Sequence, residues 1–397
     1  MTDRERRARG MLHARRAEIA PFIAMDVMSS ARRLEASGRD VVHMEIGEPG
    51  HGAPKPAIDA AMARLASGRI GYTEALGLPE LRARIARHYR DVHGLEIAAE
   101  RIAVTTGSSS GFVLAFLAMF DPGQRVAIAS PGYPPYRTIL QALGLEPVEI
   151  EVGAAQRWAL DGKAIARAHA ERPLEGLLIM SPANPSGTMI DATALQDIAT
   201  TCRNLGIRLI SDEIYHGLTY GMAATSALRF DDDAVIINSF SKYWCMTGWR
   251  VGWMVLPETL LRPVERLAQN LFISAPTLSQ VAATVAMDAH EELAVVHQGY
   301  ARNRDLLLRE LPRAGLDSFL PPDGAFYLYA DIGHLTNDSA AFARAMLDEA
   351  GVAATPGMDF DHARGSRFLR FSYAGSEADI AEAVRRIALW RNGTRST

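Results

Sequence analysis

The stretch that decides the fold is residues 234–250, AVIINSFSKYWCMTGWR. It opens with an apolar, β-branched run that has the length of a buried strand, and Lys242 follows the strand closely. The chain has 42 lysines and arginines, but its only lysines are Lys55, Lys163 and Lys242. A primary amine forms a Schiff base with an aldehyde, whereas a guanidinium cannot. Lys242 is therefore a candidate for covalent chemistry, with a snorkelling strand-end lysine as the structural alternative.

The residues around this stretch repeat a pattern of apolar strand, polar turn and helix. Strands are predicted at residues 101–105, 125–129, 177–180, 207–210 and 234–238, and helices at 17–40, 54–67, 78–93, 112–120 and 191–205. Apolar strands separated by helices predict an α/β fold with a mainly parallel sheet covered by helices on both faces. Ligands bind such sheets outside the carboxyl ends of the strands.

The predicted strand ends carry groups that suit one ligand. Serines at the start of a helix can hold a phosphate, as can an arginine. An aromatic ring can stack on a flat ligand, an amide can donate to a ring oxygen, and a carboxylate can accept from a protonated ring nitrogen. The residues that supply these groups are Ser108, Ser109, Tyr133, Asn184, Asp212 and Arg250. Any one of these residues is a weak signal, but their occurrence together at successive strand ends is a more specific indication of a binding site.

Taken together, these motifs resemble the class I/II aminotransferases, the aspartate-aminotransferase-like fold type I family of pyridoxal-phosphate enzymes. The resemblance runs from Gly47 to Arg370, and Ser186 stands where threonine is common. The matching stretches are residues 71–73 with Gly77, 106–109, 131–134, 184–188, 211–215, 239–242, 248–252 and 370–373.

The resemblance implies two domains. A large cofactor-binding domain of residues 50–295 would hold a mainly parallel, seven-stranded type of sheet covered by helices. A smaller α/β domain would be formed by both chain ends, residues 1–49 and 296–397.

The resemblance also implies pyridoxal 5'-phosphate as the cofactor. Lys242 would hold it as a Schiff base and shuttle the α-proton, while Asp212 would keep the pyridine nitrogen protonated. Tyr215 and Asn184 would hydrogen-bond the phenolic oxygen, and Tyr133 would stack on the ring. The phosphate would be held by Gly107, Ser108, Ser109, Ser239, Ser241 and Arg250, and by Tyr72 of the partner subunit. A homodimer with shared sites is therefore expected.

Substrate binding is expected at Arg370, whose planar fork would hold the α-carboxylate with help from Gly47 and Asn184. The implied activity is ping-pong transfer of an amino group between an α-amino acid and a 2-oxo acid. A β-eliminating carbon–sulfur lyase is the alternative, because it would use the same lysine. No second carboxylate clamp can be assigned from the sequence, so the substrate side chain stays open.

Other classes fit less well. A Rossmann dehydrogenase is disfavoured because residues 106–111, TGSSSG, lack the GxGxxG spacing. The segment before Gly47 is expected to be too short for the winged helix of a cofactor-sensing regulator.

Composition bounds the partners and the location. The net charge is −4 and the isoelectric point is about 6.3, so the chain lacks the excess of basic residues that is typical of nucleic-acid-binding proteins. Only Cys202 and Cys245 are present, and no apolar run is long enough to span a bilayer, so we expect a cytoplasmic, metal-free protein. The first sixteen residues hold six arginines and are expected to form a mobile or subunit-contacting arm.

Overall fold

The computed structural model describes residues 13–394. Most of the predicted N-terminal arm, including Arg4, Arg6, Arg7 and Arg9, lies outside these residues. Within the described part, no helix is long and apolar enough to cross a membrane.

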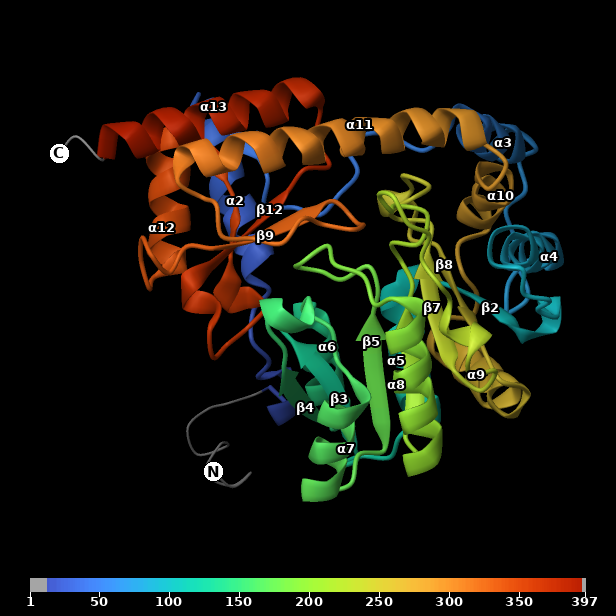
Figure 1. Cartoon of the computed structure of the whole chain (residues 1–397). Helices are drawn as coiled ribbons and strands as arrows, with labels where there is room; N and C mark the ends of the chain where they lie inside the picture. Colours follow the sequence, from blue (N-terminus) through green and yellow to red (C-terminus); the bar gives the residue numbers. More distant parts are fainter. Residues whose placement is uncertain (1–12, 395–397) are drawn as a thin grey trace.

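A seven-stranded sheet forms the centre of the larger half of the molecule (Figure 1). Its strands in spatial order are β2 (Ile102–Thr105), β8 (Gly252–Val255), β7 (Val235–Ser239), β6 (Arg208–Asp212), β5 (Gly176–Met180), β3 (Arg125–Ser130) and β4 (Glu146–Glu151). Only β8 runs against the others, because it pairs antiparallel with both β2 and β7. The prediction of a mainly parallel sheet is therefore confirmed.

Helices cover both faces of this sheet, since successive strand residues point to opposite sides. Along β2, Ile102 and Val104 pack into one core cluster and Ala103 into the other. The first face is covered by α3 (Lys55–Ala66), α4 (Pro79–His88), α7 (Gly162–Glu171), α8 (Ala192–Leu205) and α10 (Thr277–Ala286). The second is covered by α5 (Gly107–Met119), α6 (Pro134–Ala142) and α9 (Glu258–Leu271).

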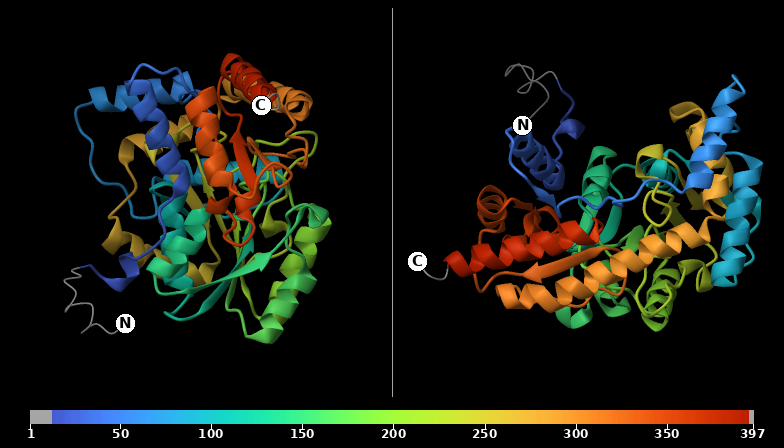
Figure 2. Two further views of the ribbon diagram at one scale, coloured as in Figure 1. Left: turned by 90° about the vertical axis from the view of Figure 1, so that its left-hand side faces the viewer. Right: turned by 90° about the horizontal axis from the view of Figure 1, so that it is seen from above.

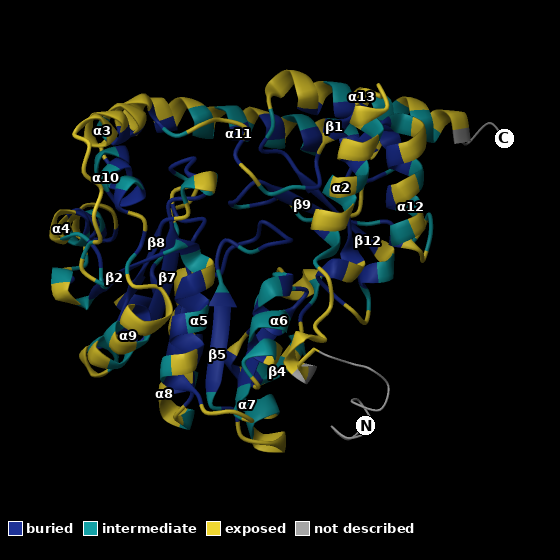
Figure 3. Cartoon of the chain, turned by 180° about the vertical axis from the view of Figure 1, so that it is seen from behind, coloured by how far each residue is buried: buried dark blue, intermediate teal, exposed yellow. Residues whose placement is uncertain are grey.

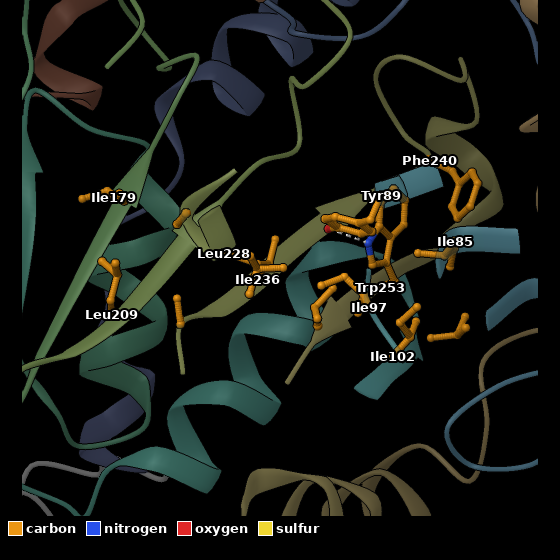
Figure 4. Close-up of a cluster of buried hydrophobic side chains, with 14 of the residues drawn as sticks. Ile85, Tyr89, Ile97, Ile102, Ile179, Leu209, Leu228, Ile236, Phe240 and Trp253 are labelled. Carbon is orange, nitrogen blue, oxygen red and sulfur yellow. Dashed lines mark hydrogen bonds between the residues drawn. The ribbon is translucent and has the colours of Figure 1, made fainter. Parts of the chain in front are cut away.

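The first of these cores is rich in aromatic and branched side chains (Figure 4). Trp253 of β8 lies buried against Phe240, and its indole nitrogen donates a 3.2 Å hydrogen bond to the Tyr89 hydroxyl. This packing supports β7, the strand that precedes Lys242, on the face of the sheet that carries this core.

A second core lies around two smaller sheets. A three-stranded antiparallel sheet has the order β11 (Thr355–Pro356), β12 (Phe368–Ser372), β9 (Tyr327–Asp331). A two-stranded sheet joins β1 (Val42–His43) to β10 (Val352–Ala353), so the two ends of the chain pair in parallel. The surrounding helices are α2 (Ile23–Ala36), α11 (His290–Glu310), α12 (Ser339–Ala345) and α13 (Glu377–Thr394). Helices α11 and α13 lie side by side (Figure 2), and the strands are buried beneath them (Figure 3).

Two local features place the site residues. Helix α5 begins at Gly107, so residues 107–111, which precede the predicted helix 112–120, form its first turns. Helix α2 spans 23–36, less than the predicted 17–40. The division of the chain at about residues 50 and 295 stays a prediction.

Candidate active site

A cavity of about 370 Å³ lies where the large sheet meets the three-stranded sheet. The carboxyl ends of β5 and β6 point into this region, and β9 and β12 close it from the other side (Figure 1). Many residues that line it were predicted from the sequence: Gly47, Ser108, Tyr133, Asn184, Asp212, Tyr215, Lys242 and Arg370. The fold thus brings together residues that span more than three hundred positions.

Lys242 is partly buried in the cavity wall, and its Nζ donates to the Gly47 carbonyl oxygen at 2.5 Å. Burial lowers the pKa of this amine to about 8, although the Glu48 carboxylate opposes the shift. A substantial fraction is therefore neutral near pH 8, which is the form that attacks an aldehyde.

Asp212 ends β6 and is also buried. One carboxylate oxygen accepts from the backbone N–H of Ile214 at 3.0 Å, and the other accepts from the Tyr136 hydroxyl. Burial raises the pKa of Asp212 to about 6, so the group is ionised near neutral pH. It is a fixed negative charge at the floor of the cavity.

Arg370 lies in β12 with only 2% of its surface exposed. Its Nη1 donates to Asn184 Oδ1 at 3.0 Å, and its Nη2 donates to the Glu45 carbonyl oxygen. The guanidinium lies 4.5 Å from the Tyr327 ring centroid. Among the described residues, its Nε has no partner. A buried cation with an unused donor beside a cavity suits a carboxylate ligand.

Tyr215 and Tyr327 meet in the wall of the same cavity. Their hydroxyls are 2.7 Å apart, and both side chains are buried. A Cβ added at Gly47 would lie 1.7 Å from the Tyr327 hydroxyl, so the close approach of the two segments requires glycine. The Gly47 carbonyl can then reach Lys242.

The opposite end of the site is built around the start of α5. A Cβ added at Gly107 would lie 2.5 Å from Arg250 Nη2, and one added at Gly252 would lie 3.0 Å from the Ser108 nitrogen. Both Gly107 and Arg250 have positive φ, at 71° and 54°. A guanidinium beside a glycine-rich helix N-terminus forms a cradle that suits a phosphate.

Sequence and structure comparisons agree on one family. The sequence model of "Aminotransferase class I and II" matches residues 39–387. A valine–pyruvate aminotransferase of Mycobacterium tuberculosis is 48% identical, over 95% of this chain and 98% of the relative.

The chain belongs to the class I and II aminotransferases.

Solved structures support the same assignment. An aminotransferase from Mycobacterium tuberculosis superposes with a TM-score of 0.93 and 47% identity, over 96% of this chain and 99% of that one. The aspartate aminotransferase of Thermus thermophilus with maleate superposes with a TM-score of 0.90 and 31% identity, over 95% and 99%. The predictions of fold type I and of a transaminase are confirmed.

Other predicted residues of this aminotransferase lie outside the cavity lining. Ser239 and Ser241 are buried, and the Ser239 hydroxyl lies 2.9 Å from that of Ser241. Ser109 is exposed in the first turn of α5. Tyr72 is 86% exposed and makes no part of the site in its own chain. Their roles stay predictions.

Several residues of the site were missed by sequence reasoning. Tyr136 stands three positions after Tyr133, so the shared helical face of PGYPPY could have indicated it. Thr355, which accepts from Arg370 Nη2 at 3.2 Å, carries no local signal because only the pairing of β11 with β12 brings it there. The α2 side of the cavity was also missed: Phe22, Ala24, Met25, Met28 and Arg32.

Proposed function

We propose that this aminotransferase carries pyridoxal 5'-phosphate, covalently attached to Lys242, and alternates between amino acid and 2-oxo acid in a ping-pong cycle. Class I and II aminotransferases generally use this cofactor, which supplies a ring that withdraws electrons from the substrate α-carbon. The observation that carries the proposal is the arrangement in one cavity of a partly buried amine, a buried carboxylate and a buried guanidinium.

Each group has a role that its surroundings favour. The Asp212 carboxylate, which Tyr136 and the Ile214 N–H hold in place, would accept from the ring nitrogen and keep it protonated. The cradle of Gly107, Ser108 and Arg250 would receive the phosphate, and Tyr133, which lines the cavity, would stack on the ring.

The substrate is held at the other end. Arg370 binds the α-carboxylate, which every amino acid shares, and Asn184 orients the guanidinium. The Lys242 amine moves the proton from the α-carbon, because its lowered pKa makes it a competent base near neutral pH. The names of the relatives include valine and aspartate, so they do not select a side chain.

Borohydride trapping and one half-reaction test the proposal. Reduction of the purified holoprotein is expected to fix the cofactor to Lys242, with Lys55 and Lys163 unmodified. Excess amino acid without a 2-oxo acid should then convert the cofactor stoichiometrically to its amine form, and pyruvate should reverse the conversion.

Two results would contradict it. Trapping at Lys55 or Lys163 would remove Lys242 from its role. Continuous release of ammonia and pyruvate from cysteine or cystathionine, with the cofactor staying in its aldehyde form, would make the protein a β-lyase.

We also propose a homodimer whose sites are shared. Tyr72 is exposed, and so are the apolar side chains of Ile70 on its own segment and of Phe272 and Ile273 before α10. The hydrogen bond from Thr277 to the Gly71 carbonyl joins the segment of Tyr72 to the start of α10, a few residues after Ile273. A second copy on this face would cover them and present Tyr72 to its neighbour's phosphate cradle. A cytoplasmic location stays a prediction, with which the two buried, free cysteines are compatible.

A further inference from the structure

The residue whose carbonyl oxygen holds Arg370 also carries a buried carboxylate, to which the proposed chemistry gives no role. Glu45 is fully buried, and its Oε2 has no hydrogen-bond partner among the described residues. Its Oε1 lies 2.7 Å from His43 Nδ1, and within the described part of the chain this is the one ion pair that Glu45 forms. A buried carboxylate without a cation is costly, so the placement of the Glu45 side chain depends on His43.

His43 stands between two carboxylates, one at each ring nitrogen. Its Nδ1 faces Glu45, and its Nε2 lies 3.2 Å from Glu35 Oε1 on α2. A neutral imidazole has a single N–H and can donate to one of them, whereas the imidazolium donates to both. This arrangement favours the protonated ring, and the hydrogen bond with Glu45 is the largest cause that raises the pKa of His43 to about 9.

The other charged groups near His43 do not replace it as the partner of Glu45. They line the same groove and come from α2, from α13 and from the segments beside β1. These groups are Arg32, Asp40, Glu48, Asp379, Glu382 and Arg386. Four of the six are acidic, and Arg386 is already paired with Asp40 and Glu382. Loss of the His43 proton therefore leaves the Glu45 carboxylate without a cation.

Glu45 lies just beyond the point where strand pairing ends. The Met44 N–H donates to the Ala353 carbonyl at 3.0 Å, and the Met44 carbonyl accepts from the Ser372 N–H at 2.7 Å. Among the described residues, hydrogen bonds between backbone groups resume only at Gly50. The segment between is held by contacts that involve side chains, and the pair of Glu45 with His43 is the first of them.

The Glu45 carbonyl belongs to a cluster that fixes the carboxylate-binding guanidinium. It accepts from Arg370 Nη2 and, at 2.8 Å, from the Thr355 hydroxyl. The Thr355 oxygen in turn lies 3.2 Å from Arg370 Nη2, and Asn184 holds Nη1. Two-bond recognition of a carboxylate depends on the plane of the guanidinium. A shift of the Glu45 carbonyl would turn that plane.

We propose that His43 and Glu45 are positioning residues for the substrate carboxylate: protonated His43 holds the Glu45 side chain, and the Glu45 carbonyl sets the plane of the Arg370 guanidinium. The inference rests on the proposed function, in which Arg370 binds the α-carboxylate, and it adds a dependence on pH. Carboxylate binding is strongest while His43 carries its proton. It weakens as the pH rises through about 9, where the raised pKa of His43 lies.

Binding of a plain carboxylate tests the inference without turnover. In calorimetric titration of the holoenzyme at pH 7, propanoate should bind about threefold to tenfold more weakly to His43→Gln than to the wild type. The ratio of the two affinities should approach one at pH 10, where wild-type His43 is neutral as well. A loss of stability alone would reduce the amount of folded protein but not the affinity of the folded sites. His334→Gln is the matched control, since His334 is exposed beside the Gly315 carbonyl, and its ratio should stay at one.

Removal of both partners gives a second readout. Glu45→Gln keeps the shape of the side chain and removes its charge. The double variant of His43→Gln with Glu45→Gln leaves no buried charge unpaired, so it should recover most of the affinity that His43→Gln alone loses. In the half-reaction with valine or aspartate, His43→Gln should raise the amino acid concentration that gives half-saturation and leave the limiting rate nearly unchanged.

The outcomes separate this inference from the proposed function. Arg370→Lys should also weaken propanoate binding, which places the probe at the guanidinium. If it does so while His43→Gln binds like the wild type at pH 7, or if the defect of His43→Gln persists unchanged at pH 10, the inference is overturned. If Arg370→Lys has no effect, the carboxylate site itself is wrong, and the inference falls with it. If no amino acid is converted but both variants weaken propanoate binding as described, the proposed function fails and the inference stands.

Discussion

At the scale of single residues, Arg370 shows how much a side chain depends on partners that its own segment does not supply. Its guanidinium is held by Asn184, the Glu45 carbonyl and Thr355, from three distant segments. The sequence predicted Arg370, Asn184, Asp212 and Lys242, since each follows a local motif. Thr355 and Glu45 could not be predicted, because long-range strand pairing alone makes them neighbours.

Replacement of Arg370 by lysine keeps the positive charge but removes the planar guanidinium that can bind a carboxylate through two parallel hydrogen bonds. We expect Arg370→Lys to lose about 2–4 kcal/mol in kcat/KM with every amino acid substrate, since the α-carboxylate is common to all. Arg367→Lys is the matched control: Arg367 lies three residues earlier, is paired with Asp331 and is half exposed. A loss limited to acidic substrates would mean that Arg370 binds the side chain.

The buried Glu45 carboxylate gives the stability of the protein a pH dependence. His43 Nδ1 lies 2.7 Å from Glu45, and this hydrogen bond raises the pKa of His43 to about 9. Because the folded-state pKa exceeds the unfolded value of about 6.5, the stabilisation is complete below pH 6.5 and is lost as the pH rises through 9.

His43→Gln should therefore lower the free energy of unfolding by about 1 kcal/mol near pH 6, since the ring is one-third exposed and the pair is partly screened. Chemical denaturation at several pH values measures this difference. It should shrink as the pH approaches 9, and a difference that does not depend on pH would contradict the linkage.

At the scale of elements, helix and strand types were predicted better than their ends. Helix α8 matches its prediction closely, because Asp191 caps its start and Gly206 ends it with φ of 69°. Helix α2 has no such local signals: the groups that cap its first turn belong to Asp359, more than three hundred residues later. Its bounds were therefore predicted too wide, and its inner face was missed as part of the site.

At the scale of the whole molecule, the sequence predicted a parallel sheet but not the order of its strands. Strand β8 lies between β2 and β7 and reverses direction, because the segment after Lys242 turns back along β7. This return brings Arg250 to the N-terminus of α5 and so completes the phosphate cradle. The order of the strands could not be predicted because strand pairing depends on the whole chain. The motifs at the strand ends could be predicted because each is local in the sequence.

A site shared between two chains can be tested by mixing two variants. If Tyr72 serves the partner's site, Tyr72→Ala and Lys242→Ala damage different halves of the same site. In a mixed dimer, one site then combines the intact Lys242 of one chain with the intact Tyr72 of the other. We expect two nearly inactive variants, unfolded and refolded together, to recover roughly a quarter of wild-type activity, since half of the dimers are mixed and each has one complete site.

A second pair of variants provides the control. Arg370 is buried in its own chain beside its own Asn184, so a mixture of Lys242→Ala with Arg370→Lys should recover no activity beyond that of its components. Sedimentation should show dimers in both mixtures. If the Tyr72→Ala mixture also stays inactive while dimers form, Tyr72 acts in its own chain, and a fully active monomer would remove the shared site altogether.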